Sequence, residues 1–189
     1  MGGNSHKKTI LFSFWKFVYL ANVLFALPFS EVNRGDRMKV AMRVIGPETY
    51  DTVGEMMVDF MNEVAPQMRR RPDSLEYART AALHCERSGQ LLGAFGQGDE
   101  LVGFMCMAKH SSLISAGLHL EISELYVRPN FRNLGIGAKF IERALEFCHD
   151  VGIRRIVLST GVADLNQAPN SFYKRHGFEF IGPYLRKTV

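Results

Sequence analysis

The sequence predicts an α+β fold with a mixed, mostly antiparallel central sheet flanked by helices. Two apolar runs, residues 91–95 and 101–107, lie on either side of Gln97-Gly-Asp-Glu100, which is a turn signal typical of a hairpin. A further strand-like run at 118–127 is followed by a helical pattern and a short apolar run at 155–159, which indicates a β-α-β unit. Because a hairpin is antiparallel and a crossover helix joins parallel strands, the two together predict a mixed sheet.

The remaining elements follow from hydrophobic periodicity and from helix start signals. In chain order we expect a strand at 40–45, a helix at 48–65, a helix at 75–87 capped by Ser74, a small-residue connection at 111–117, a helix at 169–175 and a last strand at 178–185.

Composition limits the classes of function. The chain has 189 residues, 47% of them hydrophobic, and a formal net charge of +4. This predicts one ordinary domain, and the absence of a basic stripe interleaved with aromatics argues against a nucleic-acid binder. Three separated cysteines without a C-x-x-C pair predict buried free thiols and a reducing, cytoplasmic location. The scattered histidines include no pair at ligand spacing, so no metal site is expected.

The first 37 residues do not match the rest, and we separate them from the expected domain at 38–189. Residues 9–29 are apolar and aromatic and follow His6-Lys7-Lys8, a profile that fits a membrane anchor or a signal peptide. A third interpretation is upstream translation without function, because Met38 precedes a strand-like segment. Membrane contact is expected only through residues 9–29, and the alternatives stay open.

The loop Arg132-Asn-Leu-Gly-Ile-Gly137 carries the strongest functional signal. It joins the expected strand at 118–127 to a helical pattern, and glycines there leave main-chain N–H groups free to bind an anion. The chain lacks a P-loop, and Phe140 stands where a dinucleotide-binding loop has its third glycine. The loop therefore predicts a phosphorylated ligand of another class.

A second segment, Asn166-Gln-Ala-Pro-Asn-Ser-Phe-Tyr-Lys-Arg-His-Gly-Phe178, follows one helix and one strand later. Together the two segments resemble the signature of the GNAT superfamily of acetyl-CoA-dependent N-acyltransferases, over roughly residues 40–185. Pro169 stands where the family usually has alanine, and proline is tolerated in a first helical turn. The resemblance implies a GNAT-like fold and acetyl-CoA as co-substrate.

The resemblance also implies which residues hold the cofactor. Amides near residues 125–127 would bind the pantetheine arm and polarise the thioester carbonyl, and those of residues 134–138 would bind the pyrophosphate. Asn166 would contact the cofactor nearby. The expected cofactor-binding residues are Leu125, Tyr126, Val127, Arg132, Asn133, Leu134, Gly135, Ile136, Gly137, Ala138, Asn166 and Tyr173.

Acetyl transfer to an amine requires a proton acceptor, because neutralising an alkylammonium at pH 7 costs about 4–5 kcal/mol. Glu121 and Glu124 lie in the strand before the loop, and either could be the base. Alternation places them on opposite faces unless a bulge intervenes, with Glu121 on the face of Leu125 and Val127; this slightly favours Glu121. By resemblance, Tyr173 donates a proton to the departing CoA thiolate.

Two functions from different classes remain. The first is an enzyme that acetylates a primary amine by direct attack in a ternary complex, with a glutamate base and a tyrosine acid. The second is a non-catalytic acyl-CoA-binding sensor or scaffold, which has no need of Tyr173 or the strand glutamates. The acceptor, a small-molecule or peptide amine, has no readable motif, and a homodimer is left open.

Overall fold

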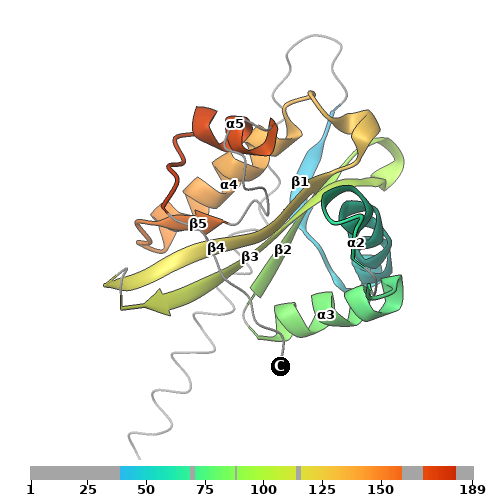
Figure 1. Ribbon diagram of the computed structural model, residues 1–189, viewed down its shortest axis with the longest axis horizontal. Coiled ribbons are helices and arrows are strands. Elements are labelled where there is room, and N and C mark those ends of the chain that lie inside the picture. The colour runs from blue at the N-terminus through green and yellow to red at the C-terminus, as the bar shows by residue number, and fades with distance from the viewer. Residues whose placement is uncertain (1–38, 69–70, 88, 114–115, 159–167, 182–189) are drawn as a thin grey trace, which may run out of the picture.

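A computed structural model describes residues 39–68, 71–87, 89–113, 116–158 and 168–181. Within them lies a five-stranded sheet in the order β1-β2-β3-β4-β5 (Figure 1). Neighbouring strands are antiparallel except for the parallel pair β4–β5, so the predicted mixed, mostly antiparallel sheet is confirmed. The strands are β1 (Ala41–Val44), β2 (Gly89–Phe95), β3 (Leu101–Ser112), β4 (Gly117–Val127) and β5 (Ile156–Leu158).

Two layers of helices cover the sheet (Figure 1). Helices α2 (Tyr50–Val64) and α3 (Ser74–Glu86) pack on one face, while α4 (Ile136–Asp150) and α5 (Ala168–Arg175) pack on the other. Side chains from the strands alternate between two buried clusters, because successive residues of a strand point to opposite faces. One cluster contains Phe140 of α4 and the other Met56 of α2.

Local sequence sets where the helices begin. The N-cap of α3 is Asp73, not the predicted Ser74. The Asp73 side chain accepts a hydrogen bond from the Glu76 amide at 2.8 Å, and the Glu76 side chain accepts one from the Asp73 amide at 3.0 Å. This capping box satisfies two otherwise free amides. Pro47 opens a 3-10 turn, Pro47–Thr49, which leads into α2.

Two predicted boundaries were wrong. The connection expected at 111–117 is shorter, because β3 continues through Ser112. The last strand, expected at 178–185, is absent from its described part, residues 178–181; the remainder lies outside the described residues.

The ladder between β3 and β4 contains a bulge. Cys106 pairs with Glu124 and Met107 pairs with Ile122, which leaves Ser123 without a partner. An extra residue in one strand reverses the alternation of side chains beyond it. The bulge therefore decides which side chains of β4 share a face.

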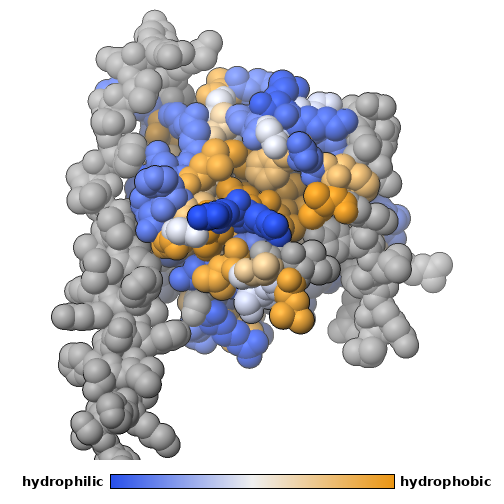
Figure 2. Space-filling view, turned by 90° about the vertical axis from the view of Figure 1, so that its left-hand side faces the viewer, coloured by the Kyte–Doolittle hydropathy of each residue, from blue (hydrophilic) through white to orange (hydrophobic). Residues whose placement is uncertain are grey.

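Figure 2 views the molecule from the side toward which the β3–β4 hairpin projects in Figure 1. Hydrophobic surface there is interrupted by hydrophilic residues. Leu113 and Leu118, at the end of this hairpin, are exposed.

No described helix combines the length and apolar character needed to cross a bilayer, and the segment at 9–29 lies outside the described residues.

Candidate active site

Strand β4 has an edge that β5 covers only in part. The β4–β5 pairing runs from Leu120 to Ile122, so in the described part of the chain β4 pairs only with β3 beyond that point. The Arg128 amide donates to Val102 of β3 at 2.9 Å, and the Val127 carbonyl points away from β3 to accept from Arg132 Nε at 2.9 Å. Since main-chain groups alternate between edges, the amides of Leu125 and Val127 face the edge away from β3.

The loop before α4 presents main-chain donors at the end of β4. In the described residues, the amides of 133–138 donate to no main-chain carbonyl, and the first helical bond from this region runs from the Lys139 amide to Gly135. Asn133 and Gly135 have positive φ (63° and 81°), and Leu134 between them does not. Such alternation forms a concavity of N–H groups, and a helix N-terminus adds a favourable dipole for anions. The loop fits a diphosphate.

Helix α5 packs on the start of α4. A Cβ at Gly137 would lie 3.1 Å from the Phe172 ring, so the glycine permits this close approach. Tyr173 packs edge-on against Phe172 at 5.1 Å and against Phe178 at 5.6 Å. It also contacts the cluster that contains Val127 and Ile136. The structure thus brings Tyr173 to the same side of the sheet as the α4 N-terminus.

Burial determines the acid–base character of Tyr173. It raises the pKa of this phenol from its ordinary value of 10 to about 12, because the charged phenolate loses solvation. Tyr173 therefore stays protonated at neutral pH and can act as a proton donor.

The two candidate bases lie on the same face of the sheet. Glu121 pairs with Ala108 and Glu124 pairs with Cys106, and these two partners are two positions apart on β3. Residues two apart on a strand share a face, so the bulge brings the two glutamates to one face and the expectation of opposite faces was wrong. Burial raises the pKa of Cys106, and the charge of Glu124 raises it further. Cys106 belongs to the cluster beneath α2. Glu121 and Glu124 therefore face the α2 and α3 side.

The reason for preferring Glu121 was consequently wrong. Leu125 and Val127 contact the cluster under α4, on the opposite face from Glu121. Alternation from Glu121 predicted a shared face because the extra residue at Ser123 cannot be seen in the sequence pattern.

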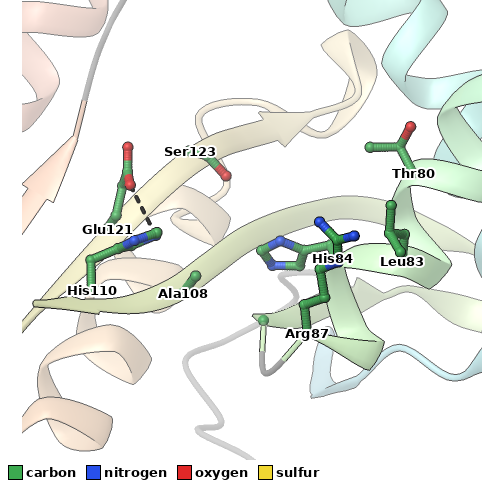
Figure 3. Close-up of a pocket in the computed structure, with 9 residues that line it drawn as sticks. Thr80, Leu83, His84, Arg87, Ala108, His110, Glu121 and Ser123 are labelled. Carbon is green, nitrogen blue, oxygen red and sulfur yellow. Dashed lines mark ion pairs between the residues drawn. The ribbon is translucent and has the colours of Figure 1, made fainter.

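An open pocket of about 370 Å³ lies between α3 and the strands β3 and β4 (Figure 3). Its side chains include Glu121 and His110, whose Oε2 and Nε2 atoms are 3.1 Å apart. His84 of α3 and Arg87, the residue that follows this helix, line the pocket from the other side.

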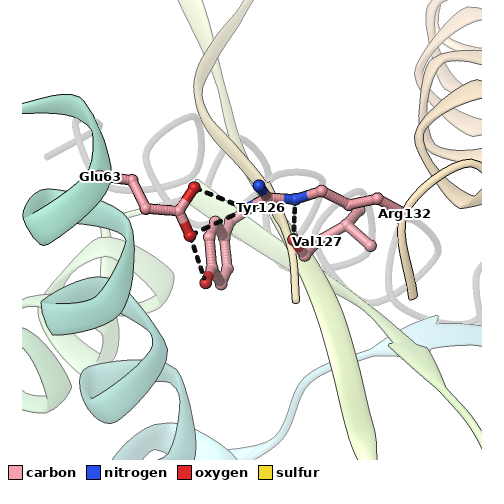
Figure 4. A network of polar contacts seen from close by, with 4 residues as sticks. All are labelled: Glu63, Tyr126, Val127 and Arg132. Atoms are coloured by element: carbon pink, nitrogen blue, oxygen red, sulfur yellow. Dashed lines mark hydrogen bonds and ion pairs between the residues drawn. The ribbon is translucent and has the colours of Figure 1, made fainter. Parts of the chain in front are cut away.

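A polar network joins α2 to the loop before α4 (Figure 4). Arg132 Nη2 donates to both oxygens of Glu63, at 2.9 and 2.7 Å, and the Tyr126 hydroxyl donates to Glu63 Oε1 at 3.1 Å. Burial, followed by the charge of Glu63, raises the pKa of Tyr126 to about 12. The Arg132 guanidinium, which the resemblance placed among the cofactor-binding residues, is thus directed toward Glu63.

Sequence reasoning missed Glu63, because no motif marks it and its partner lies 69 positions away. Asn166 lies outside the described residues. Cys85, Cys106 and Cys148 are free, as predicted, although Cys85 is only partly buried. In the described part of the chain, no group of three or more His, Cys, Asp or Glu side chains could hold a metal ion.

Residues 56–178 match the acetyltransferase (GNAT) family, and this span is more than half of the chain. The chain belongs to this family. The resemblance seen in the two sequence motifs is therefore confirmed.

The similar proteins are distant relatives. An uncharacterized N-acetyltransferase of Methanocaldococcus jannaschii is 40% identical over 79 residues, which are 41% of this chain and 34% of that protein. The chain thus matches about a third of that relative's length. Thialysine N-epsilon-acetyltransferase of Bos taurus is 28% identical over 128 residues, which are 60% of this chain and 72% of that protein. The crystal structure of a Trypanosoma brucei acetyltransferase superimposes with a TM-score of 0.62 at 16% identity, covering 79% of this chain and 99% of the other.

Proposed function

We propose that the protein transfers an acetyl group from acetyl-CoA to a primary amine. The observation that carries the proposal is the run of amides at 133–138, which have no main-chain acceptor in the described residues and lie at the end of a partly uncovered β4 edge. Membership of the acetyltransferase (GNAT) family supports the same reaction.

The residues present fit acetyl-CoA, which when bound would supply an activated acetyl thioester. The amides of residues 133–138 would hold the diphosphate. The amides of Leu125 and Val127 would bind the pantetheine arm and the thioester carbonyl. Main-chain donors that are already fixed in place stabilise developing negative charge without having to reorganise.

Glu124 is the better candidate for the base. A base must lie within hydrogen-bond reach of its proton, directly or through one water. The ladder partners of Glu121 and Leu125, Ala108 and Met105, are three positions apart on β3, which is about 10 Å at 3.3 Å per residue, whereas Glu124 is the neighbour of Leu125. Glu124 then accepts the proton of the acceptor ammonium, which frees the nitrogen lone pair for attack.

Tyr173 is the proposed acid. Its phenol is protonated at neutral pH and would donate that proton to the departing sulfur. The new bond is C–N and the broken bond is C–S. The nitrogen must lose a second proton to become an amide, and that proton returns to Tyr173 through water. Glu124 gives its proton to water, so an ammonium acceptor yields the amide, the free thiol and one released proton.

The test is release of free thiol from acetyl-CoA with a panel of amines: peptide amino termini, polyamines, amino acids and aminoglycosides. We expect Glu124→Gln to lower kcat/KM by about 10²-fold or more. Glu142→Gln is the control, because it removes the same charge from an exposed position of α4 outside the proposed substrate sites.

The proposal has clear points of failure. Tight CoA binding with no thiol released by any amine would favour the non-catalytic acyl-CoA-binding module. A larger loss of kcat in Glu121→Gln than in Glu124→Gln would exchange the roles of the two glutamates.

A further inference from the structure

We propose that the pocket between α3 and strands β3 and β4 binds the amine acceptor, and that this acceptor is a free α-amino acid with a second amine at the end of its side chain. The proposal rests on the acetyl transfer proposed above and names the substrate class of that reaction.

The pocket has the size and place of an acceptor site. Its volume of about 370 Å³ is in the range of small-molecule sites, which are roughly 300–1,000 Å³. Glu121 and Ser123 line it, and Glu124 follows on the same strand face, beside the β4 edge proposed for the thioester. An amine that enters from this pocket therefore meets Glu124 before the acetyl group.

The floor of the pocket is fixed by His84. Its Nε2 lies 3.1 Å from the Met107 carbonyl and 3.3 Å from Cys106 Sγ. Gly89 lies directly beneath the ring, where a Cβ would come within 2.1 Å of the same nitrogen. Because β3 holds the imidazole through both polar contacts and Gly89 of β2 lies against the ring, the pocket is formed before an acceptor arrives.

The pocket walls carry opposite charges. No described residue forms an ion pair or side-chain hydrogen bond with the Arg87 guanidinium, which lies on the α3 side. A guanidinium presents a planar fork of donors that matches a carboxylate. Across the pocket, Glu121 offers its second oxygen beyond the contact with His110 (Figure 3). An α-carboxylate on Arg87 and an α-ammonium on Glu121 would satisfy both groups.

The bulge supplies the third point of recognition. It places Glu124 on the face of Glu121 and three positions nearer the loop, which is at most about 10 Å along the strand. A side chain with several methylenes would span this interval and present its terminal amine to Glu124. A peptide amino terminus lacks the free α-carboxylate beside its amine, so it would leave Arg87 without a partner.

The test compares lysine with 1,5-diaminopentane, which lacks only the carboxylate. We expect the wild-type protein to favour lysine in kcat/KM by roughly 10- to 100-fold, the value of a charged hydrogen-bonded pair. Arg87→Gln should abolish this preference by raising the KM for lysine, with kcat nearly unchanged. Arg79→Gln is the control, because it removes a charge from an exposed position of α3 that does not line the pocket.

Calorimetric titration of lysine into the CoA-bound protein separates this proposal from the proposed function. If lysine binding depends on Arg87 but no thiol is released from acetyl-CoA, the proposed acetyl transfer is wrong and the assignment of the pocket to lysine remains supported. Thiol release with the diamine or a peptide amine as efficient as with lysine would overturn the pocket assignment and leave the transferase. A lysine preference retained in Arg87→Gln would also overturn it.

Discussion

The Glu63 carboxylate in α2 lies 2.7 Å from the Arg132 guanidinium in the loop before α4. The pair joins the helix layer on the acceptor side to the loop proposed for the diphosphate. Tyr126 supports it from β4, with its hydroxyl on Glu63 and its ring 5.5 Å from the guanidinium carbon. A diphosphate bound at this loop would therefore compete with Glu63 for Arg132.

That competition predicts the effect of Glu63→Gln. The substitution removes the charge that holds Arg132 but keeps an oxygen for Tyr126, so we expect CoA to bind severalfold more tightly. The side chains of Arg132 and Glu63 are 41% and 39% exposed, so the unfolding free energy should fall by no more than about 1 kcal/mol.

Calorimetric titration with CoA and urea denaturation measure these two quantities. Glu55→Gln is the control, since it removes a charge from an exposed position of the same helix. An equal gain in affinity in both variants would show a general charge effect, and weaker CoA binding in Glu63→Gln would contradict the competition.

The sequence predicted the parts of the site that depend on local rules. Gly135 and Gly137 predicted the main-chain amides of the loop before α4, because turns and helix starts require particular residue types at particular positions. The bulge at Ser123 could not be predicted, because it depends on how β3 pairs with β4, and it changed the face assigned to Glu121. Glu63 was missed for a similar reason: only the packing of α2 on the sheet brings it to Arg132.

Gly135→Ala tests whether the loop before α4 binds the diphosphate. Gly135 has φ of 81°, where a side chain costs about 1–2 kcal/mol although space for a Cβ is open. We expect a loss of stability of that order and weaker CoA binding, because relief of the strain turns the loop amides away.

Gly152→Ala provides the matched control. Gly152 has φ of 71° and equally open space, but it follows the far end of α4. It should lose similar stability in urea denaturation while CoA binding by calorimetry stays normal. If Gly135→Ala also binds CoA normally, the loop does not hold the diphosphate.

Deletion of Ser123 tests the bulge. Without this residue Glu124 would follow Ile122 directly, and their partners Cys106 and Met107 are adjacent on β3, so a regular ladder can form. Because bulges bend a strand and redirect its edge, we expect the deletion variant to fold but to bind CoA at least tenfold more weakly.

Circular dichroism and thermal unfolding would verify the fold of this variant, and calorimetry its CoA affinity. Ser123→Ala keeps the backbone and should bind CoA normally. Unchanged affinity in a folded deletion variant would show that the bulge has no part in the cofactor site.

Tyr173→Phe tests the proposed acid and its altered ionisation together. The substitution removes the proton donor but keeps the ring contacts with Phe172 and Phe178, so kcat should fall by about 10²-fold or more with CoA affinity unchanged. The pKa of Tyr173 is raised to about 12, so its stabilising contribution is fully present below pH 10 and is lost as pH rises through 12. Unfolding followed across pH 10 to 12 should therefore show a smaller loss of stability in Tyr173→Phe than in the wild-type protein.

Tyr50→Phe is the control, because burial raises the pKa of Tyr50 to about 12 as well, yet this residue packs in the cluster under α2. It should reduce the same pH dependence and leave kcat intact; equal kcat values in the two variants would remove Tyr173 from the chemistry.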